Sequence, residues 1–343
     1  VRWCGKVQGR NPLHLTRLVS QSCSPLPTFL IPPSPRNRLS RPRHQNSPMT
    51  SHDPIHVCWT IDCEATQEAI GDTALGIRSL RGFCDLLLAN GCAGTLFVVP
   101  GDARAYPALL RELAGAGFQV GLHFHPQEEG HRDYCGAYTA EEQYAMYRRG
   151  LEQFADAVGF VPGTFRTGNC SANDATFPVT ENLGFTSCSH SMPGRNMPGL
   201  RSNWVNAPLS VHSTHRANRL LEGDMRLVEV PVTTDPDSML WSGRHPQDLR
   251  VELFDAKNHR YMIEKVLSRE HARPPGLVRT LVVLTHNIFD YSDPADFRRH
   301  TLQQMICDFG QLAEQKAIEL TPSTIGAAAR AHRRAAGTGQ EVH

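Results

Sequence analysis

Acidic residues are absent from the first 52 positions of this 343-residue chain, although the whole sequence holds 34 of them against 35 lysines and arginines. Eight of the basic residues lie in this acid-free stretch, so the rest of the chain has 27 basic and 34 acidic side chains, a net charge of −7. A nucleic-acid-binding protein needs a basic face to neutralise phosphates. The acidic body therefore argues against a nucleic-acid partner.

The chain also lacks long apolar runs and regular cysteine spacing. No stretch reaches the roughly 18 apolar residues of a membrane-spanning helix, so no transmembrane segment is expected. The ten cysteines are scattered without a Cys-x-x-Cys pair. This pattern indicates neither a zinc ribbon nor a disulfide scaffold and favours buried thiols in a reducing compartment. No clean apolar core follows the basic start, so we expect no secretory signal and a cytoplasmic location.

Residues 1–50 form a basic leader rich in proline, serine and arginine, and eight of the 24 prolines fall there. Proline lacks the N–H that helices and sheets require, so we expect the leader to be extended and disordered. It is typical of an organelle-targeting peptide or of a basic arm for an anionic surface, and we favour a third interpretation, that it is no part of the native protein. We expect a folded domain over 51–335 and a flexible tail over 336–343.

Predicted strands and helices alternate through the body. The strands are expected at 55–61, 94–99, 118–122, 164–166, 227–232, 281–285 and 317–320, and the helices at 75–89, 103–116, 139–158, 174–182, 297–315 and 324–334. Repeated strand–helix units imply a parallel sheet, and so many of them in one domain predict an α/β barrel. Residues 190–250 break this rhythm, and we expect them to form a long, functional loop.

Charged and metal-binding side chains follow four predicted strands at their carboxyl ends, where a parallel barrel places its active site. They are Asp62 and Glu64, His123 and His125, Arg166, and His286. Residues i and i+2 of a strand point to the same face, so each of the two pairs can project into the barrel mouth. Each residue taken singly has an ordinary structural explanation, but four strands that all end in these residue types favour a site.

Two imidazoles and one or two carboxylates make a His₂-carboxylate site for Zn²⁺ or a similar divalent ion, with positions left open for water and substrate. Such an ion lowers the pKa of its water to about 7 and polarises a carbonyl group. A second carboxylate can then act as a general base, and a histidine across the site can protonate the leaving group.

Four segments carrying these residues resemble the motifs of the polysaccharide deacetylase family, the NodB-homology carbohydrate esterases. They are 60–64 (TIDCE), 121–126 (GLHFHP), 165–169 (FRTGN) and 284–287 (LTHN). The resemblance extends over about 55–325 and implies a distorted (β/α) barrel, often of seven strands. It further implies a hydrolase that uses a divalent metal, usually zinc, to remove acyl groups from amino sugars.

The resemblance also assigns a role to each residue. Asp62 is expected to be the general base, His286 the general acid, and Arg166 the residue that orients the base. Glu64, His123 and His125 are expected to hold the metal.

Two departures from the family pattern indicate a divergent branch. The usual second motif spaces its histidines by four, but position 127 is Gln127, so the pair is His123 and His125. The first motif has Glu64 two positions after Asp62 instead of an aspartate directly after it. This difference leaves open which of the two carboxylates binds the metal.

The expected substrate is an acylated carbohydrate or another amide. Asn169 and the aromatic residues Trp204, Trp241 and Tyr291 are candidates for substrate contact, the aromatic ones by stacking on sugar rings, although packing in the core is the favoured alternative for each aromatic side chain. The alternatives are a metal-dependent amidohydrolase acting on a small non-sugar amide, a glycosidase using Asp62 and Glu64, and a non-catalytic glycan-binding protein on the same fold. The identity of the substrate, the metal and the oligomeric state stay open at this stage.

Overall fold

The computed structural model describes residues 53–337, so the predictions for the leader and for most of the tail lie outside the described residues. The strands that build or flank the main sheet are β1 (Ile55–Cys63), β2 (Thr95–Val98), β3 (Gln119–Phe124), β4 (Thr164–Thr167), β5 (Ser187–Cys188), β8 (His212–Ser213), β9 (Val228–Glu229), β12 (Arg279–His286) and β13 (Leu320–Ser323). Two small hairpins are formed by β6 (Asn196–Met197) with β7 (Ser202–Asn203), and by β10 (Thr234–Leu240) with β11 (His245–Asp248).

The α-helices of the described residues are α1 (Thr73–Ala89), α2 (Pro100–Ala105), α3 (Pro107–Gly115), α4 (Ala140–Val158), α5 (Thr176–Asn182), α6 (Ala256–His271), α7 (Phe297–Gln315) and α8 (Ile325–Ala335). Helix α4 begins with the capping box expected from its sequence, in which Thr139 and Glu142 each accept a hydrogen bond from the other's backbone N–H. Between residues 53 and 337 no helix combines the length and apolar character needed to cross a membrane.

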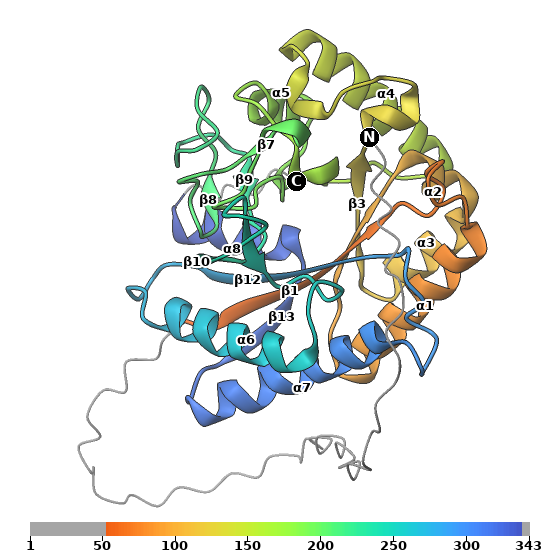
Figure 1. Cartoon of the computed structure of the whole chain (residues 1–343). Helices are drawn as coiled ribbons and strands as arrows, with labels where there is room; N and C mark the ends of the chain where they lie inside the picture. The colour runs from red at the N-terminus through yellow and green to blue at the C-terminus, as the bar shows by residue number, and fades with distance from the viewer. Residues whose placement is uncertain (1–52, 338–343) are drawn as a thin grey trace, which may run out of the picture. The chain divides into compact units, whose positions relative to one another are not determined.

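The main sheet is parallel over most of its width. Within the described residues, seven strands in the order β12-β1-β2-β3-β4-β5-β9 pair in parallel, each with the next, while β13 also pairs with β1 and β8 runs antiparallel to β9. Figure 1 shows this curled sheet with helices, among them α3, α4, α6 and α7, around its outside. The predicted fold class, a distorted α/β barrel of about seven parallel strands, is confirmed.

Segments between β9 and β12 connect the two ends of this row of strands. The backbone N–H of Thr233 donates to Val282 and that of Leu249 donates to Thr233. Leu284 donates to Leu249 and receives a hydrogen bond from the N–H of Val251. Part of the predicted long loop 190–250 thus supplies the irregular side of the barrel, where regular strand pairing gives way to single bridges.

Several element predictions are wrong in detail. The expected helix 103–116 is two helices, because Pro107 lacks the N–H that would continue α2 and instead occupies the first turn of α3. The expected strand 317–320 lies three residues later, as β13. Helix α6 was not predicted, although Asp255 caps it by accepting a hydrogen bond from the Asn258 N–H. Polar and charged residues dilute its apolar stripe, which obscures the helical period.

Helix α1 packs so closely on the segment after β12 that a Cβ atom at Gly82 would lie 2.3 Å from the carbonyl carbon of Tyr291. An alanine inside a helix normally adds up to about 1 kcal/mol of stability over glycine. We expect Gly82→Ala to lower the free energy of unfolding by about 1–3 kcal/mol instead, because backbone must move to admit the methyl group. Urea unfolding followed by circular dichroism measures the change.

Gly310 provides the matched control for this test, because it lies exposed in α7 and an added Cβ atom would meet nothing within 4 Å outside its own helix. Gly310→Ala should raise the free energy of unfolding by up to about 1 kcal/mol. Equal effects of the two substitutions would contradict the close packing of α1.

Candidate active site

The carboxyl ends of β1 and β12 bring Asp62, Glu64 and His286 to one place. Asp62 is the register partner of His286 in the parallel pair β1·β12. Asn287 connects the two strand ends, since its backbone N–H donates to the Asp62 carbonyl (3.0 Å) and its Oδ1 accepts from the Glu64 N–H (2.8 Å). Asn287 belongs to the segment 284–287 (LTHN), and no role was predicted for it. Its role in the structure is to position both carboxylates.

Another buried carboxylate, Asp102 of α2, fixes the backbone of the residues directly after Glu64. It accepts hydrogen bonds from the backbone N–H groups of Ala65 (3.1 Å) and Thr66 (2.8 Å) and from the Asn287 side chain (2.9 Å). The Tyr106 hydroxyl also donates to it. This network was missed, because no sequence motif connects Asp102 to a strand end 40 residues earlier in the chain.

The carboxyl end of β3 supplies His123, and His125 follows directly after the strand. Both direct a ring nitrogen toward Glu64. The His123 Nδ1 lies 2.9 Å from the Arg166 carbonyl oxygen, which can accept only from an N–H. The proton is thereby assigned to Nδ1, and Nε2 keeps its lone pair. The Nε2 atoms of the two histidines are 3.1 Å apart, and His125 Nε2 is 3.0 Å from Glu64 Oε2. Gly168 makes room for this arrangement, because a Cβ there would lie 2.5 Å from the His125 ring.

These three side chains fit a divalent metal. Each of Glu64, His123 and His125 offers one ligand atom, and these three atoms lie within 4.8 Å of one another. Two nitrogens that share a tetrahedral zinc ion at about 2.0–2.1 Å are about 3.3 Å apart, close to the spacing of the two Nε2 atoms. The donor set, two imidazoles and one carboxylate, suits zinc and related ions and leaves a coordination position free.

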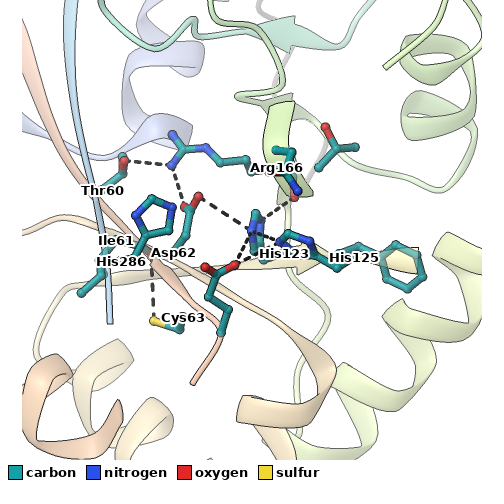
Figure 2. A network of polar contacts seen from close by, with 12 residues as sticks. Thr60, Ile61, Asp62, Cys63, His123, His125, Arg166 and His286 are labelled. Atoms are coloured by element: carbon teal, nitrogen blue, oxygen red, sulfur yellow. Dashed lines mark hydrogen bonds and ion pairs between the residues drawn. The ribbon is translucent and has the colours of Figure 1, made fainter. Parts of the chain in front are cut away.

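Arg166 of β4 pairs with Asp62 inside the barrel. Its Nη1 donates to Asp62 Oδ1 (2.7 Å) and to Thr60 Oγ1 (3.0 Å), and the guanidinium lies over the Phe97 ring at 4.1 Å. Its remaining donors bond Ser189. Figure 2 shows Arg166 and His123 directed toward Asp62, with His125 beside His123 and His286 near Asp62. Burial alone would raise the pKa of Asp62, but the positive charge of Arg166 opposes it, and the pKa lies below its usual value.

His286 has the opposite kind of partner. Its Nδ1 lies 2.5 Å from Glu252 Oε1, and the other carboxylate oxygen accepts a hydrogen bond from Thr285 at 2.8 Å. Burial would lower the pKa of His286, but the negative charge of Glu252 dominates and raises the pKa to about 9. Glu252 was missed, because it follows β11 in the irregular part of the barrel, 34 positions from its partner and in no recognisable motif.

Six of the predicted site residues line one small cavity. It has a volume of about 80 Å³ and is lined by the metal-binding candidates together with Asp62, His286, Asn169, Cys170, Met192, Arg195, Arg250 and Leu284. A larger cavity of about 810 Å³ adjoins it and shares Glu64, His125 and Asn169. Asn169 therefore lies at the boundary between the two cavities, and its contact with substrate stays a prediction.

The prediction that Trp204 and Tyr291 stack on sugar rings is wrong. Both are fully buried, Trp204 beside Phe177 and Tyr291 against Phe83. Trp204 instead supports the cavity from behind, since its Nε1 donates to the Cys170 carbonyl at 2.7 Å. That bond steadies a strained segment in which Asn169 and Cys170 both have positive φ angles, 58° and 51°.

Trp241 differs from the other two aromatic candidates, because it is 43% exposed. It stacks on His245 with 4.4 Å between ring centroids. It does not line either of the two cavities described above. Its contact with substrate stays a prediction.

Part of the sequence matches a known protein family. Residues 78–188 match the sequence profile of a family described as polysaccharide deacetylase. This stretch contains His123, His125 and Arg166. The predicted resemblance to that family is confirmed over this stretch. No curated protein matches the sequence.

Solved structures share the fold at low sequence identity. A putative polysaccharide deacetylase from Mycobacterium smegmatis is similar, with 18% identity, 81% of this chain and 96% of the other covered, and a TM-score of 0.52. A Puue allantoinase has 15% identity, 88% and 100% coverage, and a TM-score of 0.58. A probable polysaccharide deacetylase from Pseudomonas aeruginosa PAO1 has 14% identity, 82% and 91% coverage, and a TM-score of 0.55.

Metal analysis of two single variants tests which carboxylate binds the ion. Glu64→Gln should lose at least about tenfold in affinity for Zn²⁺, because a neutral amide replaces a charged ligand beside His125. Asp62→Asn should bind close to one ion per chain, since Asp62 is held by Arg166 instead. Dialysis against zinc followed by elemental analysis measures both. Loss of the metal from Asp62→Asn with its retention in Glu64→Gln would exchange the two roles.

Proposed function

We propose that this protein is a zinc-dependent deacylase that removes an acetyl or similar acyl group from an amide-linked amino sugar or its polymer. The observation that carries the proposal is that Asp62, paired with Arg166, and His286, paired with Glu252, line one cavity together with the Glu64–His123–His125 donor set. The family match supports the reaction, hydrolysis of an amide between an acyl group and an amine.

Asp62 serves as the general base. Arg166 occupies its Oδ1, so Oδ2 is the atom that takes the proton from the attacking water; it lies 3.7 Å from His123 Nε2, at the edge of the donor set. A divalent ion held by Glu64, His123 and His125 would supply Lewis acidity, which polarises the acyl carbonyl and makes water more acidic. Arg166 keeps Asp62 ionised and fixes its orientation.

His286 serves as the general acid. Glu252 binds its Nδ1, which leaves Nε2 to carry the proton that the departing amine receives. The pKa values of the two groups are pushed apart in the sense this chemistry requires, with the base ionised and the acid protonated at neutral pH. Asn169, at the boundary of the two cavities, is placed to contact the sugar on its way into the larger one.

The small size of the inner cavity favours a second candidate, a hydrolase of small non-sugar amides. A volume of about 80 Å³ holds only a few heavy atoms, and an allantoinase is among the similar folds. The adjoining cavity of about 810 Å³ has room for sugar rings and favours the deacylase.

Incubation of the zinc-loaded protein with a panel of N-acetylated sugars, oligosaccharides and small amides tests the proposal. Mass spectrometry should detect loss of 42 Da from acetylated sugars, the difference between an acetamide and its amine. Asp62→Asn should reduce kcat by at least about 100-fold, because the general base is lost. Hydrolysis of the small amides alone would favour the second candidate, and no hydrolysis by metal-loaded protein would favour a non-catalytic glycan-binding protein.

The pH dependence of kcat/KM tests the pairing of His286 with Glu252. A raised pKa means that His286 stays protonated up to about pH 9 and that activity falls as pH rises through that value. Glu252→Gln removes the charge that raises this pKa, so the alkaline limb should move to lower pH by about one to three units. The exposed Glu112 of α3 provides the control Glu112→Gln, which should leave the profile unchanged. An unmoved alkaline limb in Glu252→Gln would exclude His286 as the acid.

A further inference from the structure

Two arginines that no step of the proposed reaction uses lie in the wall of the catalytic cavity. They are Arg195, which precedes β6, and Arg250, which follows β11, and both line the same cavity of about 80 Å³ as Asp62 and His286. Neither belongs to the segments that carry the family resemblance.

Arg195 is only 6% exposed and forms no ion pair with any residue between 53 and 337. Its Nη1 donates to the Asn169 carbonyl at 2.9 Å, and its Nε lies 3.3 Å from the sulfur of Met197. A buried guanidinium without a carboxylate is costly, because an ion taken out of water loses its hydration without Coulombic compensation. Other buried arginines of the site have such a partner, as Arg166 has in Asp62.

Arg250 has an ion-pair partner, but one of its donors has no hydrogen-bond partner. Its Nη2 bonds Asp248 at 2.9 Å, but its Nε is buried and has no hydrogen-bond partner. Burial, together with the nearby charge of Arg250, lowers the pKa of Arg195, so the two guanidinium groups are close enough to repel. An anion between them would relieve the repulsion and give Arg195 the ion-pair partner that it lacks.

We propose that Arg195 and Arg250 bind a carboxylate of the substrate, so that the preferred substrate is an N-acyl amine bearing a carboxylate within a few bonds of the scissile amide. This inference rests on the proposed deacylase function and adds to it the charge of the substrate. The cavity is too small for a sugar ring as well, so the carboxylate enters it with the scissile group while the rest of the substrate occupies the larger cavity.

The carboxylate can belong to the amine part or to the acyl part, and two pairs of substrates distinguish these sources. The first pair is an N-acetylated α-amino acid, whose carboxylate is attached to the carbon that bears the amide nitrogen, and its carboxamide. The second is an N-succinyl hexosamine and its succinamoyl counterpart. In one of the pairs, the acid should have a kcat/KM at least about tenfold above that of its neutral amide, because only the acid satisfies the buried guanidinium groups. Ratios near one in both pairs would overturn the inference.

Arg195→Gln should reduce the preference for the acid to within about threefold of unity, whereas Arg195→Lys, which keeps the charge, should retain part of it. The exposed Arg81 of α1 offers the control Arg81→Gln, expected to keep the wild-type preference. An unchanged preference in a folded Arg195→Gln variant would overturn the inference. If that variant does not fold, the wild-type ratios above decide the question.

A binding measurement separates this inference from the proposed function. Succinate should raise the melting temperature of chelator-treated wild-type protein, and succinamide should not. Stabilisation by succinate with no hydrolysis of any substrate would support the carboxylate site and reject the deacylase. Hydrolysis of neutral substrates with no effect of succinate and no preference for acids would reject the carboxylate site alone.

Discussion

The buried ion pair between Arg166 and Asp62 is the contact on which the arrangement of the site depends. The two residues come from β4 and β1, which are separated in the sheet by β2 and β3, so their contact crosses the barrel interior. Two charges out of water require hydrogen bonds on every side. The Arg166 guanidinium donates such bonds to Thr60 and Ser189, and it also lies over Phe97. The result is a carboxylate that stays ionised deep in the barrel and keeps one oxygen available.

In the second ion pair, between His286 and Glu252, the roles of the two charges are exchanged. A carboxylate, Glu252, keeps an imidazole protonated, whereas in the first pair a cation keeps a carboxylate ionised. One member of each pair lies on adjacent strands, Asp62 on β1 and His286 on β12, and the backbone pairing of these two residues sets their spacing. An enzyme that must both take up and release a proton near neutral pH needs this separation of pKa values, and here neighbouring charges produce it while burial opposes it.

The cavity wall combines strain with support from the core. Asn169 and Cys170 adopt left-handed conformations that cost energy in residues other than glycine, and Trp204 and Arg195 each bond a carbonyl of this segment from the protein side. Trp204, predicted to contact substrate, therefore supports the backbone of the cavity wall. The same segment lies where the small cavity meets the larger one, since Asn169 lines both.

The sequence by itself determined the alternation of strands and helices, the parallel barrel and the six residues Asp62, Glu64, His123, His125, Arg166 and His286, because local periodicity and strand-end position carry that information. Only the tertiary structure decided what surrounds them. Segments without a motif contribute Glu252, Asp102 and Arg195 to the site. Trp204 and Tyr291 are buried in the core and do not line the cavity. A side chain's partner and exposure depend on which distant segments pack together, and short-range pattern does not encode that packing.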